Sequence, residues 1–184
     1  MKAAAQIGLG IACSMAASAM GVAVFINSGV YDIGADDHHT KLVTAMIETL
    51  RERSISVRAG SIDVPGLEDP AKIAAGAQRY STLCVGCHLA PGVTKSALRP
   101  GLYPHAPNLA QEDLRDARKA FWTIKHGIKM SAMPAWGKSL DDATIWEIVA
   151  FARQLPTMSP ETYQQLSMSP ETYQQLSKSH TEGL

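Results

Sequence analysis

Cys84-Val85-Gly86-Cys87-His88 is the stretch from which the rest of the chain is best interpreted. Two cysteines three residues apart share one face of a helical turn, with about 5–6 Å between their Cβ atoms. At that spacing both thiols can form thioethers with the two vinyl groups of one porphyrin. The histidine that follows then lies beneath the ring, where its neutral imidazole can ligate the iron. The Cys-x-x-Cys-His pattern therefore indicates covalent haem attachment at Cys84 and Cys87, with His88 as an axial ligand.

A Cys-x-x-Cys pair also occurs in zinc sites and in redox-active dithiols. A zinc site with four cysteines needs a second pair, and the only other cysteine, Cys13, lies in the apolar N-terminal segment. A thioredoxin-like dithiol would stand in a βαβ pattern, which the sequence does not show. Three cysteines, two of them in the motif, also exclude a disulfide framework.

The composition limits the class of protein. The 184 residues include 17 basic and 17 acidic side chains, so the chain has no formal net charge. Nucleic-acid binding normally needs a basic face, and a nucleic-acid partner is therefore not expected. The length allows one domain with additional segments. Because covalent haem attachment is normally completed outside the bacterial cytoplasm, the motif itself predicts export.

The N-terminal segment is uncharged from Ala3 through Tyr31, after the cationic Lys2 and before the acidic Asp32. About 20 apolar residues are enough to span a bilayer, and the flanking charges place the N-terminus inside. This pattern predicts a single-pass membrane anchor. The alternative is a cleaved signal peptide, for which Ala17-Ser18-Ala19 is a plausible site. Cleavage there would leave an apolar new terminus, residues 20–26, so an uncleaved anchor is favoured.

Residues 32–68 form a polar connector that contains one amphipathic helix. Asp or Thr side chains can cap its start, apolar residues recur at helical spacing over 42–50, and Gly60 is a stop signal. The apolar stripe is expected to lie on the haem domain, the membrane or a partner subunit. His38 or His39 could instead bind a second metal or haem. Adjacent histidines point in different directions on a helix, however, and no second attachment motif exists.

The haem domain is expected to begin with a helix at Asp69-Pro70, since proline suits the first helical position. Gly76 permits close approach of another helix, and Tyr80 lies one turn later on the same face. Trp146 or Phe151 is expected to pack against this face. Further helices are predicted from Asp113 to Lys125 and from a capping Ser139 to Leu155-Pro156.

Three prolines within residues 98–109 predict a loop around the ring. An iron-bound histidine usually donates its other N–H to a fixed acceptor. The carbonyl of Pro107 is a candidate acceptor for His88, although Pro107 could equally be a simple turn residue. Three residues are expected to support the axial ligands: Tyr80, Pro107 and Trp136.

The sixth iron ligand is expected within Ile124–Gly137, where Met130 and Met133 compete. A methionine thioether opposite histidine raises the reduction potential. Pro134 follows Met133, and its fixed φ and missing N–H favour an irregular ligand loop, so Met133 is the preferred ligand. Met130 is then a core or haem-edge side chain. His126 could give a bis-histidine haem, but its place at a helix end favours a capping or surface role.

In its order of motifs the chain resembles class I c-type cytochromes, specifically the membrane-anchored monohaem bacterial type. The similarity is strong over residues 69–157 and loose over 31–58. Many relatives have glycine where Ala132 stands, which is a small departure. The resemblance implies an all-α class I cytochrome c fold, one haem c and one-electron transfer. The site residues that it implies are thioethers at Cys84 and Cys87 and axial ligands His88 and Met133.

The C-terminal tail contains the same decapeptide twice, at residues 158–167 and 168–177. Each copy offers Ser-Pro-Glu as a helix start, and two short copies cannot form a solenoid. A duplicated terminal helix is therefore expected, with partner docking as the weaker alternative. The predicted organisation is an anchor or signal peptide at 1–31, a connector at 32–68, the haem domain at 69–157 and the tail at 158–184.

These features favour an electron carrier, or an electron-transfer subunit, over an enzyme. The expected location is the bacterial inner membrane, with the haem domain facing the periplasm. The expected partners are a membrane dehydrogenase, a quinol-oxidising complex or a terminal oxidase. The alternative is a haem enzyme whose sixth site is labile, acting on peroxide or a sulfur compound. A sensor is least favoured, because the sequence shows no output domain.

Overall fold

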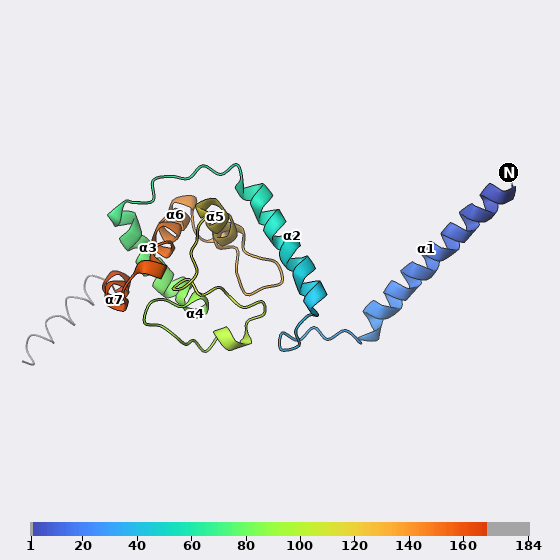
Figure 1. Cartoon of the computed structure of the whole chain (residues 1–184), viewed down its shortest axis with the longest axis horizontal. Coiled ribbons are helices and arrows are strands. Elements are labelled where there is room, and N and C mark those ends of the chain that lie inside the picture. The colour runs from blue at the N-terminus through green and yellow to red at the C-terminus, as the bar shows by residue number, and fades with distance from the viewer. Residues whose placement is uncertain (1, 169–184) are drawn as a thin grey trace, which may run out of the picture. The chain divides into compact units, whose positions relative to one another are not determined.

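The structure is a computed structural model that describes residues 2–168. Figure 1 shows that its regular elements are helices, and the described residues contain no strand beyond an isolated bridge between Ala90 and Val93. The predicted all-α class is confirmed. The α-helices are α1 Lys2–Ser28, α2 Lys41–Ala59, α3 Pro70–Leu83, α4 Val85–His88, α5 Ala117–His126, α6 Asp142–Ala152 and α7 Pro160–Ser167. Short 3₁₀ segments occupy Arg99–Gly101, Trp136–Lys138 and Leu155–Thr157.

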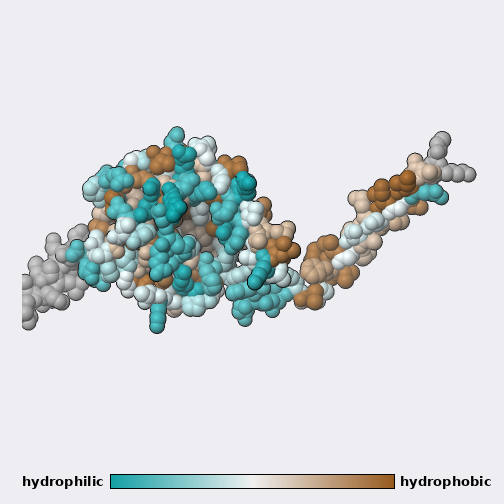
Figure 2. Space-filling model, in the orientation of Figure 1, coloured by the Kyte–Doolittle hydropathy of each residue, from teal (hydrophilic) through white to brown (hydrophobic). Residues whose placement is uncertain are grey.

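The chain divides into two compact units between Asp37 and His38. The first unit contains α1, and brown apolar residues line this helix in Figure 2. The segment Ala3–Ser28 has a mean hydropathy of 2.0 over its most apolar stretch and is long enough to cross a membrane. By length and composition it therefore qualifies as a membrane span, as a signal sequence also would.

The core of the second unit is built on the crossing of α3 and α6. Gly76 is buried where the helices meet, and a methyl group at this position would overlap the backbone carbonyl of Glu147. The ring of Tyr80 lies 5.5 Å from that of Phe151, and both side chains are buried. The expectation that Phe151 packs against the Gly76/Tyr80 face is confirmed. Trp146 instead stacks on Phe121 of α5 at 4.2 Å.

Helices α3, α5 and α6 each begin after an aspartate cap. Asp69 accepts from the backbone N–H of Ala71, so the predicted start of α3 is confirmed. The predicted start of α5 at Asp113 was four residues before Ala117, and the predicted cap of α6, Ser139, was two residues before the observed one. Asp116, and not Asp113, caps α5, and Asp141, rather than Ser139, caps α6 by accepting from Thr144. Several capping residues stand close together before each helix, and spacing does not rank them.

Helix α2 begins after Thr40 and ends at Gly60, as predicted. It contacts α5 and buries Ile55 and Ala59. The apolar stripe over residues 42–50 is not on the haem domain, because its side chains are exposed. That part of the expectation is wrong, since a different face of α2 meets the domain.

The first copy of the decapeptide forms α7, which Ser159 caps. Tyr163 is buried against the core, with its ring 6.2 Å from that of Phe151. Met158 and Leu166 are partly buried on the same cluster. The first copy thus contributes to the core, whereas the second copy lies outside the described residues beyond Met168.

Candidate haem-binding site

The Cys-x-x-Cys-His motif forms the junction of α3 and α4. Cys84 is the residue between the two helices, and its carbonyl accepts from the backbone N–H groups of Cys87 at 3.1 Å and His88 at 2.9 Å. This places the two cysteines on one helical turn. No disulfide joins them, and both are partly buried. Burial, with a smaller contribution from Cys87, raises the pKa of the Cys84 thiol to about 12.

Tyr80 fixes the residue that follows the motif. Its hydroxyl donates to the carbonyl of Leu89 at 2.7 Å, and its ring is fully buried. Leu89 has φ of 59°, an unfavourable value for a leucine that ends the helical turn directly after His88. Burial raises the pKa of Tyr80 above its usual value, so the hydroxyl remains a donor. Tyr80 therefore supports the turn that carries His88.

His88 is oriented by the loop that follows the motif. Its Nδ1 lies 3.0 Å from the carbonyl oxygen of Pro107, and its own carbonyl accepts from Leu109 N–H at 3.0 Å. A carbonyl oxygen only accepts, so Nδ1 carries a hydrogen, and in the neutral imidazole Nε2 then keeps its lone pair. Burial lowers the pKa of His88, although the Pro107 contact opposes this. The structure thus provides a neutral imidazole with Nε2 available for a metal, which fits the axial position of a haem.

The same loop is attached to the motif by two further side chains. Arg99 donates from Nη1 to the carbonyl of Cys87 at 2.9 Å. Ser96 donates from Oγ to the carbonyl of Gly86. These contacts could not be predicted from the sequence, because a hydrogen bond from a side chain to a distant backbone carbonyl has no characteristic spacing. They fix the loop that carries Pro107 to the residues that it supports.

The second half of the site is the loop after α5. The backbone N–H of Ile128 donates to the carbonyl of Met133 at 3.2 Å, and Ser131 Oγ accepts from Met133 N–H at 3.2 Å. Ser131 also donates to the carbonyl of Ile128 at 2.8 Å. These bonds close a compact turn and hold the backbone of Met133. Gly127 begins the turn with φ of 64°.

The two candidate methionines differ in exposure. Met133 is partly buried, whereas Met130 is 92% exposed and has φ of 55° at the tip of the loop. His126 is exposed at the last position of α5, with its ring 4.7 Å from that of Trp122. Trp136 is half-buried in the 3₁₀ segment after Met133. Of these side chains, Met133 combines a partly buried position with a backbone that is held at both its N–H and its carbonyl.

His38 and His39, which precede α2, contact the loop that carries Tyr103 and Pro107 and do not form a metal-binding cluster. His38 stacks on Tyr103 at 4.5 Å, and the backbone N–H of His39 donates to the Tyr103 hydroxyl at 3.2 Å. The ring of His105 meets that of His38 edge-on at 6.1 Å. Across residues 2–168, three His, Cys, Asp or Glu side chains nowhere gather in a metal-binding arrangement. These contacts attach the start of α2 to the loop that supports His88.

Comparison with known families identifies the domain that contains this site. Residues 71–151 match the family described as cytochrome c oxidase, cbb3-type, subunit III. These residues form a c-type cytochrome domain. No curated protein and no solved structure matches the chain. The predicted resemblance to c-type cytochromes and the predicted covalently bound haem c are confirmed. The cytochrome domain accordingly serves haem-based electron transfer.

Proposed function

We propose that the cytochrome domain holds a single haem c through thioethers at Cys84 and Cys87, with His88 and Met133 as the axial ligands. The contact between His88 Nδ1 and the Pro107 carbonyl is the observation that carries this proposal, because it leaves Nε2 for the iron. Burial of His88 adds support, since it favours the neutral form that ligates a metal. Bound haem c supplies an iron that takes up and releases one electron.

The residues around the site favour a carrier over an enzyme. The ring of His88 is held by the Pro107 carbonyl, and the backbone of Met133 is held by Ile128 and Ser131, so both residues would keep their positions in either oxidation state. Little rearrangement then accompanies electron transfer. The soft thioether of Met133 favours reduced iron and raises the reduction potential. An enzyme that acts on peroxide or a sulfur compound would instead need a labile sixth position.

The N-terminal helix supports a membrane location for this carrier. We infer that α1 anchors the chain in the bacterial inner membrane with the cytochrome domain in the periplasm. The matched family is described by an oxidase subunit, which supports a membrane oxidoreductase as redox partner. A terminal oxidase, a membrane dehydrogenase and a quinol-oxidising complex all fit this role. The proposed organisation is an anchor at 1–31, a connector at 32–68, the cytochrome domain at 69–157 and a tail at 158–184.

Spectroscopy of the purified full-length protein tests the ligand set, with Met133→Ala compared to Met130→Ala as its matched control. We expect one haem per chain by haemochrome assay and a methionine–iron charge-transfer band in the ferric protein. Met133→Ala should lose this band, bind CO in the ferrous state and have a lower midpoint potential, whereas Met130→Ala should resemble the wild type. Loss of the band in Met130→Ala alone would reassign the ligand. CO binding by the wild-type protein would favour the enzyme.

A pull-down from detergent-solubilised membranes tests the partner. The full-length protein should be recovered with subunits of a membrane oxidoreductase. Recovery of the free monomer alone would contradict a stable complex and leave a diffusing carrier.

A further inference from the structure

Helix α2 has an apolar stripe that faces away from the domain on which it packs. Leu42, Met46 and Leu50 are 71%, 65% and 72% exposed, and they stand four residues apart along the helix. Such residues lie above one another on one face. Val43 and Ile47 border the stripe and are also exposed. Over residues 42–50 the first half of α2 therefore presents a continuous apolar surface, and brown residues gather over α2 in Figure 2.

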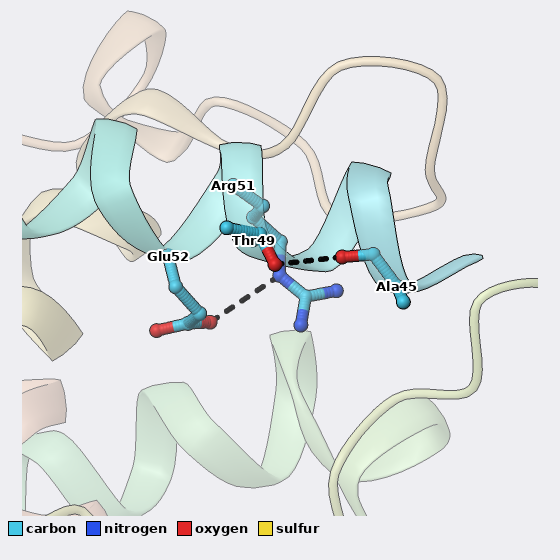
Figure 3. Close-up of polar contacts among 4 residues, drawn as sticks. All are labelled: Ala45, Thr49, Arg51 and Glu52. Atoms are coloured by element: carbon cyan, nitrogen blue, oxygen red, sulfur yellow. Dashed lines mark hydrogen bonds and ion pairs between the residues drawn. The ribbon is translucent and has the colours of Figure 1, made fainter. Parts of the chain in front are cut away.

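The side of α2 that packs on the domain lies opposite the stripe. At 3.6 residues per turn, Ile55 points about 180° away from the centre of the stripe. Ile55 and Ala59 are the buried residues of this helix. In Figure 3 Arg51 and Glu52 point from α2 toward the pale green helical ribbon, and their charged groups meet at 3.4 Å. A surface helix normally turns its apolar face inward. In the first half of α2 the apolar face is directed outward.

The position of α2 in the sequence indicates what covers this surface. Helix α1 ends at Ser28 and α2 begins at Lys41, so residues 29–40 are the only connection between them. Twelve extended residues reach at most about 40 Å. If α1 spans the bilayer, as the proposed function requires, the start of the stripe is held within about this distance of the membrane surface. A tether of this length gives a high effective concentration, so even a modest apolar area suffices for binding.

We propose that the first half of α2 lies on the bilayer surface, with Leu42, Met46 and Leu50 inserted at the boundary of headgroups and acyl chains. Lipid therefore covers the apolar stripe. The second half of the helix, where Ile55 and Ala59 are buried, lies against the cytochrome domain. Arg53 is exposed on the same side as the stripe, and its long stem allows the guanidinium to reach lipid phosphate.

This placement has a consequence for electron transfer. The start of α2 is attached through His38 and His39 to Tyr103, in the loop that also carries Pro107. A helix lying on lipid would therefore fix the orientation of the haem site relative to the membrane. The proposed carrier would then present a constant face to a membrane partner instead of rotating freely on its connector.

Site-specific photocrosslinking tests this proposal. The photoreactive residue p-benzoylphenylalanine is placed at Leu50 in the stripe, or at Glu48 as the control. Glu48 is also exposed but points about 160° away from Leu50. The full-length, haem-loaded protein is reconstituted into vesicles of phosphatidylethanolamine and phosphatidylglycerol, irradiated and examined by mass spectrometry. We expect lipid adducts at position 50 to exceed those at position 48 by at least tenfold, with unchanged haem spectra in both variants.

Each other outcome overturns the lipid assignment. A crosslinked dimer from position 50 would show that a second copy of the chain covers the stripe. Equal lipid adducts at both positions would show that lipid contact is not specific to the stripe, and absent adducts would show that the stripe stays in water. Flotation of the same vesicles tests separately whether α1 anchors the protein in the membrane. Protein that floats without lipid adducts refutes only the placement of α2, whereas protein that fails to float refutes the anchor and the placement together.

Discussion

Gly127 is the residue on which the backbone of Met133 depends most directly. It has φ of 64°, and a methyl group there would come within 2.7 Å of the carbonyl oxygen of Met133 and the backbone nitrogen of Ala135. Both contacts are with backbone, which cannot move aside as a side chain can. The glycine therefore permits the turn in which Ile128 N–H meets the Met133 carbonyl.

We expect Gly127→Ala to displace Met133 and to lower the free energy of unfolding by about 1–3 kcal/mol, because strain of this kind persists only where its surroundings enforce it. The ferric methionine–iron band should weaken, and the ferrous protein should begin to bind CO. Gly101→Ala is the control, since a methyl group there meets no atom within 4 Å. A normal band and normal stability in Gly127→Ala would refute the dependence of Met133 on this turn.

At the scale of elements, Gly76 sets how closely α3 and α6 approach. A side chain at this position would overlap the carbonyl of Glu147 and come within 3.0 Å of Phe151 Cβ. Gly76→Ala should therefore push the two helices apart and destabilise the protein by about 1–3 kcal/mol, as overpacked cores generally are. Chemical denaturation of the haem-loaded protein measures this change. Gly66→Ala, which meets no neighbour within 4 Å, should be near neutral, and an equally small effect at Gly76 would contradict the close crossing.

A second prediction at the scale of elements concerns helix α7. Tyr163 is buried among core residues, so Tyr163→Ala should cost about 3 kcal/mol of unfolding free energy. Deleting residues 158–167 gives the same chain as deleting 168–177, because the copies are identical. One copy remains to bury its tyrosine, so the single deletion should change neither stability nor midpoint potential. Deleting both copies should destabilise the domain as much as Tyr163→Ala or more, and a neutral double deletion would show that α7 does not contribute to the core.

These elements also show how far the sequence predicts the structure. Local rules located α3 at Asp69-Pro70, because a capping aspartate before a proline marks a helix start. They limited the partner of the Gly76/Tyr80 face to Trp146 or Phe151, and tertiary packing selected Phe151. The same rules began α5 at Asp113 and chose Ser139 as the cap of α6, whereas Asp116 and Asp141 cap these helices, because spacing does not show which of several nearby capping residues is used. The direction of the α2 stripe likewise depends on tertiary contacts, which periodicity does not contain.

The candidate site, too, was predictable from the sequence only in part. The motif itself named Cys84, Cys87 and His88, and general ligand chemistry pointed to an acceptor such as Pro107, which lies at hydrogen-bond distance in the structure. The attachments made by Ser96 and Arg99 could not be predicted. They join a side chain to a backbone carbonyl across ten or more residues, and only the folded loop brings those atoms together.

At the scale of the whole molecule, the membrane location depends on α1. A charged side chain at the centre of a membrane helix opposes insertion by about 2.5–3.5 kcal/mol. Met15 lies near the middle of Ala3–Ser28 and is exposed along the helix. Met15→Arg should therefore reduce the share of haem protein that remains in the membrane pellet after carbonate extraction. The wild-type protein and the matched control Met15→Leu should remain there. The intact mass of the extracted chain distinguishes an anchor from a cleaved leader, because a soluble protein that begins at Met20 would show removal of the segment and contradict the anchor.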